Sequence, residues 1–167
     1  KHFFDLAKNT DWFKNTIFVF TADHGTIKNP FYDFPLCFTH SPLIIYSPLF
    51  AKDAKVFSGL AGQIDIFNTV MGMLNVPYYN NSVGINLLKD KRKYIYFCSD
   101  DKIGCLSDNL YLIMGNDTEY LFKYKNKDIK NYIKDYKNEV DSMKQYCVNM
   151  LVATDYLIKT NIIKLKK

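Results

Sequence analysis

The sequence lacks the cysteine spacings that mark a metal-binding or redox module. Its four cysteines, Cys37, Cys98, Cys105 and Cys147, form no Cys-x-x-Cys pair and no zinc-finger spacing. Neither a structural zinc site nor a thioredoxin-like site is therefore indicated. Cys98 and Cys105 flank a predicted turn, where they would form a disulfide across a hairpin in an oxidising compartment. Four reduced thiols are the alternative.

Long apolar runs and concentrated basic patches are also missing. No run approaches the roughly 20 apolar residues of a membrane-spanning helix, and no signal peptide is recognisable. The net charge of +5 comes from basic residues spread along the chain, dense only at 89–93 and in the tail. Without a basic motif on one element, nucleic acid is not an expected partner.

What the sequence does contain is enough apolar material for a folded core. Its 167 residues are 48% hydrophobic and 16% aromatic, which excludes a disordered chain. It opens without an initiator Met, inside the amphipathic stretch KHFFDLAKNTDWFKNT. We therefore expect a piece of a longer polypeptide.

Apolar patterning predicts both helices and strands. The uninterrupted run 16–21 favours a strand covered on both faces, as in a parallel sheet packed by helices. Prolines bracket a second buried strand, and Gly and Pro mark the loop between the two. Predicted helices cover 2–9, 62–74 and about 128–159, and predicted strands cover 16–21, 42–48, 94–98, 110–114 and 119–124.

The first predicted strand ends in an unusual pair, within the stretch TIFVFTADHG. Asp23 and His24 follow the strand directly, where ligands bind in parallel α/β sheets. Gly25 would let the backbone turn, so that both side chains reach one ion. A carboxylate with a neutral imidazole suits Zn²⁺ or Mn²⁺. The alternative is that Asp23 caps a turn and His24 is an ordinary surface residue.

Three motifs occur in the order TIFVFTADHG, PLIIYSP and GQIDIFNTVMGMLNVP. Together they resemble the alkaline phosphatase and sulfatase superfamily over roughly residues 1–90. The resemblance implies an α/β fold: the C-terminal part of an alkaline-phosphatase-like sandwich, with a mainly parallel central sheet, a small antiparallel edge sheet and a long C-terminal helix. It divides the chain into a catalytic-domain part at 1–125 and a helical segment at 126–167.

Within that superfamily the sequence looks most like lipoteichoic-acid-synthase-type membrane proteins. The resemblance implies that Asp23 and His24 bind a divalent metal, Mn or Zn, with Mg or Ca as further options. The family's nucleophile lies upstream, so no catalytic nucleophile is assigned within this sequence.

The implied activity is that of a metal-dependent phosphoglycerol or phosphoethanolamine transferase, or of a related phosphodiester or sulfate ester hydrolase. The substrate would be a lipid- or glycan-linked phosphate or sulfate ester. The parent protein would be membrane-anchored, with this domain on the extracytoplasmic face. The alternative is a non-catalytic structural or binding fragment that lacks the nucleophile.

Other residues carry weaker expectations. His40, sixteen residues after His24, would be a second-metal ligand or a contact to the substrate phosphate, or else a structural, hydrogen-bonded histidine. Asp65 is expected to cap the following helix. Asn68 stands where the family commonly has Pro. Trp12 and the aromatics of 31–38 would line a substrate entrance or, alternatively, pack in the core.

Overall fold

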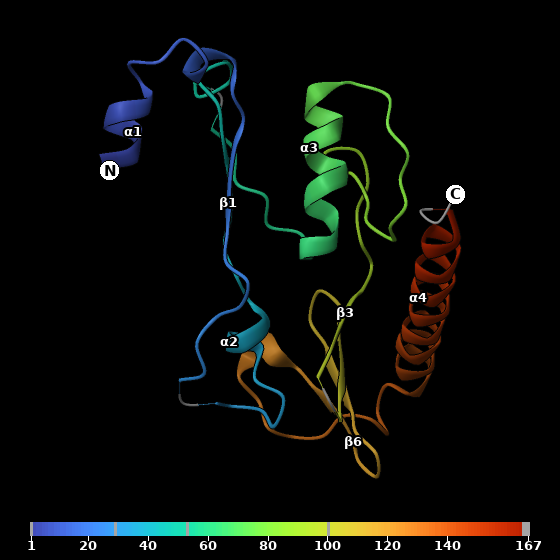
Figure 1. Cartoon of the computed structure of the whole chain (residues 1–167). Helices are drawn as coiled ribbons and strands as arrows, with labels where there is room; N and C mark the ends of the chain where they lie inside the picture. Colours follow the sequence, from blue (N-terminus) through green and yellow to red (C-terminus); the bar gives the residue numbers. More distant parts are fainter. Residues whose placement is uncertain (1, 29, 53, 100, 165–167) are drawn as a thin grey trace. The chain divides into compact units, whose positions relative to one another are not determined.

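The computed structural model describes residues 2–28, 30–52, 54–99 and 101–164. The chain forms two compact units, residues 1–58 and residues 59–167 (Figure 1). The predicted domain division after residue 125 stays a prediction. Among the described residues, no helix combines the length and apolar character needed to cross a bilayer.

The first unit is built on an aromatic core beneath a two-stranded ribbon. Phe18 is buried, and its ring lies 5.2 Å from that of Phe4, 5.4 Å from that of Phe13 and 6.0 Å from that of Tyr46, measured between centroids. Rings at such spacings contribute beyond their buried area. The elements are α1 (His2–Ala7), η1 (Phe13–Asn15), β1 (Phe18–Thr21), α2 (Leu36–Thr39) and β2 (Leu43–Tyr46).

The ribbon corrects the expected parallel sheet. β1 pairs with β2 in antiparallel register, from Phe18 opposite Tyr46 to Thr21 opposite Leu43, and the described residues contain no parallel pair. Nor is β1 covered on both faces, because Phe20 is 39% exposed and its cross-strand partner Ile44 is 59% exposed. Phe18 and Phe20 lie on the same face of β1, and that face is buried at Phe18 but open to solvent at Phe20 and Ile44.

The second unit contains the expected antiparallel edge sheet and long helix. A short 3-10 turn leads into α3, and a four-stranded meander, β3-β4-β5-β6, is followed by α4. The sequence predicted three of these strands and missed β4, whose Gly104 lies directly opposite Phe97. The elements are η2 (Gln63–Asp65), α3 (Ile66–Leu74), β3 (Ile95–Cys98), β4 (Ile103–Leu106), β5 (Tyr111–Met114), β6 (Glu119–Phe122), η3 (Tyr124–Asn126) and α4 (Lys137–Lys164).

Helix α4 packs one face on the meander. Val140, Met143 and Cys147 are buried against Leu112 and Leu121, among others, in a hydrophobic core of the unit. Their spacing of three and four residues keeps them on one side of the helix.

The sequence predicted that this helix begins near Asp128, but it begins at Lys137. Asp128 instead accepts the backbone N–H of Lys130, and Asn131 accepts the N–H groups of Leu121 and Ile133. These side-chain acceptors stabilise turns in place of helix.

Of the two alternatives for Cys98 and Cys105, the hairpin disulfide is wrong, since both cysteines are free. Cys98 lies opposite Ile103, and Cys105 lies opposite Tyr96, so the two cysteines are diagonal neighbours. Diagonal positions are about 7–8 Å apart, beyond the usual reach of a disulfide. Cys98 is also exposed, whereas Cys105 is fully buried.

Asp65 organises the start of the second unit. Its carboxylate accepts the N–H of Gly62 at 3.0 Å and the N–H of Ile85 at 2.9 Å. The predicted cap of the following helix is wrong, because the Asp65 side chain makes no capping hydrogen bond to α3. It also pairs with both Nε and Nη2 of Arg92, a partner that the sequence did not reveal. The two side chains are 0% and 5% exposed. Burial opposes the charge of Arg92, but hydrogen bonding and attraction from Asp65 outweigh it, so the Arg92 pKa is raised.

We expect Arg92→Met to lower the free energy of unfolding by about 3–5 kcal/mol, because it leaves the Asp65 charge buried without its partner. Thermal and urea melts of the full chain measure this. Lys159→Met is the matched control: its ion pair with Asp155 is exposed, so a loss of under about 1 kcal/mol is expected. Equal losses in the two variants would contradict a structural role for the buried pair.

Candidate functional site

Antiparallel pairing gathers the candidate site at one end of the ribbon. The last pair of the register joins Thr21, where β1 ends, to Leu43, where β2 begins. Residues 22–25 therefore leave the ribbon beside residues 40–42, which lead into it. The sequence expected the Asp23–His24 pair and His40 to be neighbours, and it is the antiparallel ribbon that brings their backbones together.

Gly25 is required because another backbone segment lies against it. Its N–H donates to the carbonyl oxygen of Phe38 at 2.7 Å. A Cβ at Gly25 would lie only 2.0 Å from the carbonyl oxygen of Cys37 and 3.0 Å from that of His40. Its φ is not positive, so the need is for space rather than for a left-handed turn. Any side chain here would push the 37–40 segment away.

His24 is held in one tautomer and one orientation. Its Nδ1 lies 2.7 Å from the carbonyl oxygen of Gly25, and since a carbonyl only accepts, Nδ1 carries the proton. In the neutral ring Nε2 then keeps its lone pair. The ring of Phe38 stacks on the imidazole at 4.7 Å between centroids, with 25° between the planes. The imidazole is thus preset to offer Nε2 as a ligand.

Asp23 completes a two-residue arrangement. Its Oδ1 accepts the backbone N–H of His24 at 2.8 Å, and its Oδ2 lies 3.7 Å from Nε2 of His24. Two ligands about 2.1 Å from a tetrahedral ion are about 3.4 Å apart. The side chains are 86% and 54% exposed, so both atoms are accessible to solvent. Without an ion the same geometry is a weak surface ion pair when His24 is protonated.

These donors fit a divalent metal. A ligating histidine typically donates its other ring N–H to a carboxylate, a carbonyl or water, as Nδ1 does here toward Gly25. The described residues hold no group of three or more His, Cys, Asp or Glu side chains arranged around one point. Asp23 and His24 alone therefore offer two of the ligands that a metal needs.

His40 lies next to this pair without sharing its geometry. It is the residue that ends α2, its N–H donating to the carbonyl oxygen of Leu36 at 2.9 Å. Its backbone carbonyl faces Gly25, and its side chain is exposed. The roles expected for His40 stay predictions.

The aromatic stretch 31–38 is divided between core and surface. Tyr32 and Phe34 are buried, whereas Phe31 and Phe38 are exposed. Trp12 is half exposed and contacts the ring of Phe18. Phe38, which stacks on His24, is a contributor that sequence reasoning did not single out, and only its place in an aromatic run before His40 hinted at it.

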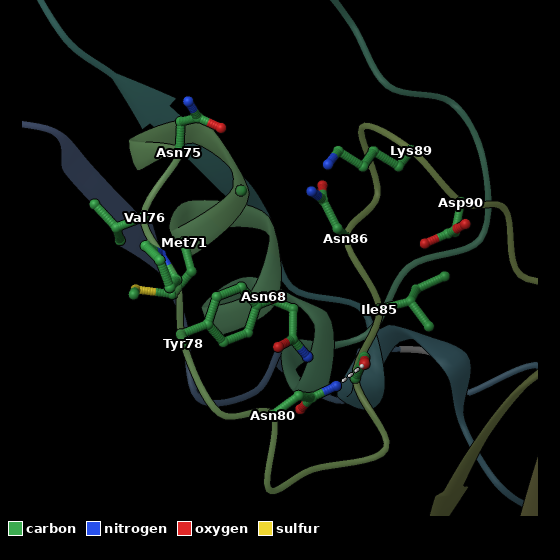
Figure 2. A pocket seen from close by; sticks show the side chains of 13 residues that line it. Asn68, Met71, Asn75, Val76, Tyr78, Asn80, Ile85, Asn86, Lys89 and Asp90 are labelled. Carbon is green, nitrogen blue, oxygen red and sulfur yellow. Dashed lines mark hydrogen bonds between the residues drawn. The ribbon is translucent and has the colours of Figure 1, made fainter.

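The second unit has an open pocket of about 550 Å³ beside α3 (Figure 2). Asn68 is fully buried at its wall, and its Nδ2 donates to Ser82 Oγ at 3.3 Å, which ties α3 to the following turn. Asn68, which stands where the family commonly has Pro, therefore has a structural role. None of the predicted site residues lies in this pocket, whose wall is formed by Asn68, Met71, Gly72, Asn75, Val76, Pro77, Tyr78, Asn80, Gly84, Ile85, Asn86, Lys89 and Asp90.

Comparison with known proteins identifies relatives of the first part of the chain. Residues 1–76 match the sulfatase family model, a range that includes Asp23, His24 and His40. A curated relative, arylsulfatase K of Gallus gallus, is 31% identical over 86 residues, which cover 48% of this chain and 16% of that protein.

A solved structure extends the likeness to the fold of nearly the whole chain. A protein in the alkaline phosphatase superfamily from Vibrio parahaemolyticus superposes with a TM-score of 0.73 at 20% identity, over 95% of this chain and 39% of that one. The chain thus spans well under half the length of either relative. Residues 1–76 are thus similar in sequence to the sulfatase family, and the chain shares the fold of a protein in the alkaline phosphatase superfamily.

Proposed function

We propose that this chain is part of a metal-dependent, sulfatase-like enzyme acting on phosphate or sulfate esters, with Asp23 and His24 as two ligands of its metal. The observation that carries the proposal is the convergence of Asp23 Oδ2 and His24 Nε2, 3.7 Å apart and both open to solvent. Sulfatase-family sequence around them supports the ester class.

The residues of this chain would hold and orient the reaction centre. The Gly25 carbonyl oxygen accepts a hydrogen bond from Nδ1–H and so favours the tautomer with Nε2 unprotonated, while Phe38 fixes the plane of the ring. A divalent ion bound here would lower the pKa of an attacking hydroxyl and neutralise charge on the transferred group. Such catalysis relies on positioning and electrostatics, which suits a site whose backbone is held as tightly as it is at Gly25.

The assignment of a specific reaction and substrate rests on the three sequence motifs. We propose phosphoglycerol or phosphoethanolamine transfer, as in lipoteichoic-acid-synthase-type proteins, with a lipid- or glycan-linked ester as substrate. Mn or Zn is the proposed metal, with Mg or Ca as further options. The parent protein is proposed to be membrane-anchored, with this part on the extracytoplasmic face.

Substrate assays separate the chemistries. Purified full-length protein is assayed with a nitrophenyl sulfate, a nitrophenyl phosphodiester and a phosphoglycerol lipid, each with and without chelator. Metal-dependent turnover of the lipid with transfer of its head group supports transfer. Turnover of the sulfate alone supports a sulfatase. No metal-dependent turnover of any ester would favour the alternative, a structural or binding fragment without catalytic activity.

We expect Asp23→Ala and His24→Ala to remove bound metal and to lower turnover more than about 100-fold, because each deletes a direct ligand. Elemental analysis and kinetics on one preparation measure both. His2→Ala, at an exposed histidine outside the site, is the control and keeps both values. Full metal content with normal turnover in either variant would contradict the assignment.

His40→Ala distinguishes three roles for that residue. A second-metal ligand predicts a fall from two metal ions per chain to one, with a sharp loss of turnover. A contact to substrate predicts unchanged metal and a lower kcat/KM. Normal metal and kinetics, with or without a lower melting temperature, would remove His40 from the site.

We expect Gly25→Ala to lower metal affinity although it changes no ligand, because the added Cβ would overlap the carbonyl oxygen of Cys37. Titration with Mn²⁺ or Zn²⁺ measures the affinity, expected to fall about 10-fold or more. Gly115→Ala is the control, because the added Cβ would lie 3.3 Å from the nearest neighbouring atom. Unchanged affinity in Gly25→Ala would show that the site does not depend on this contact.

A further inference from the structure

Two thiols from distant parts of the sequence meet in the core of the second unit. Cys105 on β4 is 0% exposed, and Cys147 on α4 is 2% exposed. Each thiol is the main influence on the pKa of the other, raising that of Cys105 and lowering that of Cys147. The Cys105 Sγ also lies 4.0 Å from the backbone carbonyl oxygen of Met143, one helical turn before Cys147.

Packing of regular elements, rather than loops, brings these thiols together. Cys105 sits between Tyr96 and Leu112 in the register of the meander, so its position is fixed by two neighbouring strands. Cys147 follows Met143 by four residues on the buried face of α4, and both belong to the same core cluster as Cys105. Docking of α4 on the sheet therefore brings both thiols into one buried cluster.

We propose that Cys105 and Cys147 form a disulfide that fastens α4 to the β3–β6 sheet. The proposal is independent of the metal site in the other unit. It gives Cys105 a partner 42 residues along the chain, in place of the neighbouring Cys98 that hairpin reasoning suggested.

The oxidant is a disulfide of a small thiol or of a thiol oxidoreductase. The Cys147 thiolate attacks one sulfur of this disulfide and releases the first thiol. The Cys105 thiolate then attacks the mixed disulfide and releases the second. The protein loses two electrons and two protons, and the oxidant leaves as two thiols.

Burial determines when the bond forms. Neither sulfur is accessible once α4 is docked, so exchange takes place during folding, before the helix closes over β4. The same burial then shields the finished bond from reductants. Cys37 and Cys98 are exposed and provide internal controls within the same chain.

Peptide mapping of the wild-type protein tests the proposal without any substitution. The full chain is unfolded and reduced, refolded in a buffer of reduced and oxidised glutathione, alkylated without further reduction, digested and analysed by mass spectrometry. We expect the peptides holding Cys105 and Cys147 to be linked, while Cys37 and Cys98 are alkylated. Alkylation of both buried cysteines, or a Cys98–Cys105 link, would overturn the proposal.

Stability provides a second readout. Reduction of the refolded wild type with dithiothreitol should lower its urea midpoint, because a cross-link that closes a long loop restricts the unfolded chain. Cys147→Ala should abolish the response to reductant, and Cys98→Ala, the matched control on β3, should retain it. A wild-type midpoint that does not change on reduction would also overturn the proposal.

Discussion

The candidate site depends on a single close approach between two backbone segments. At Gly25 the chain passes so near residues 37–40 that a Cβ would overlap the carbonyl oxygen of Cys37. The hydrogen bond from Gly25 to Phe38 closes this contact. Everything that presets His24 follows from it, because the Gly25 carbonyl orients the ring and Phe38 reaches it only from the adjoining segment.

This contact restrains the two residues that the proposed function assigns to a metal. Asp23 and His24 are exposed, so little packing of their own restrains them. Their restraint comes from the backbone hydrogen bond at Asp23, the tautomer-setting bond at His24 and the stacked ring of Phe38. Ligands fixed before the ion arrives lose less conformational entropy on binding. A two-residue half-site of this kind suits an enzyme whose other ligands come from elsewhere in its fold.

Local sequence patterns predicted most of the helices and strands, but they did not predict which residues distant in the sequence contact each other. The helix at α3, the paired strands flanking the loop and the edge meander followed from periodicity and from Gly and Pro positions. The antiparallel pairing of β1 with β2 did not, because a continuous apolar run carries no information on strand direction. Arg92 and Cys147 were missed as partners for the same reason: each meets its counterpart only after the chain has folded.

The tautomer of His24 is the most direct measure of a preset ligand. Nitrogen chemical shifts of ¹⁵N-histidine in the full-length protein report it, since this chain has only three histidines. The structure predicts a protonated Nδ1 and a free Nε2 at His24 before metal is added, and a shift confined to Nε2 when Zn²⁺ is titrated. A neutral ring protonated at Nε2, with no response to metal, would contradict the assignment of His24 as a metal ligand.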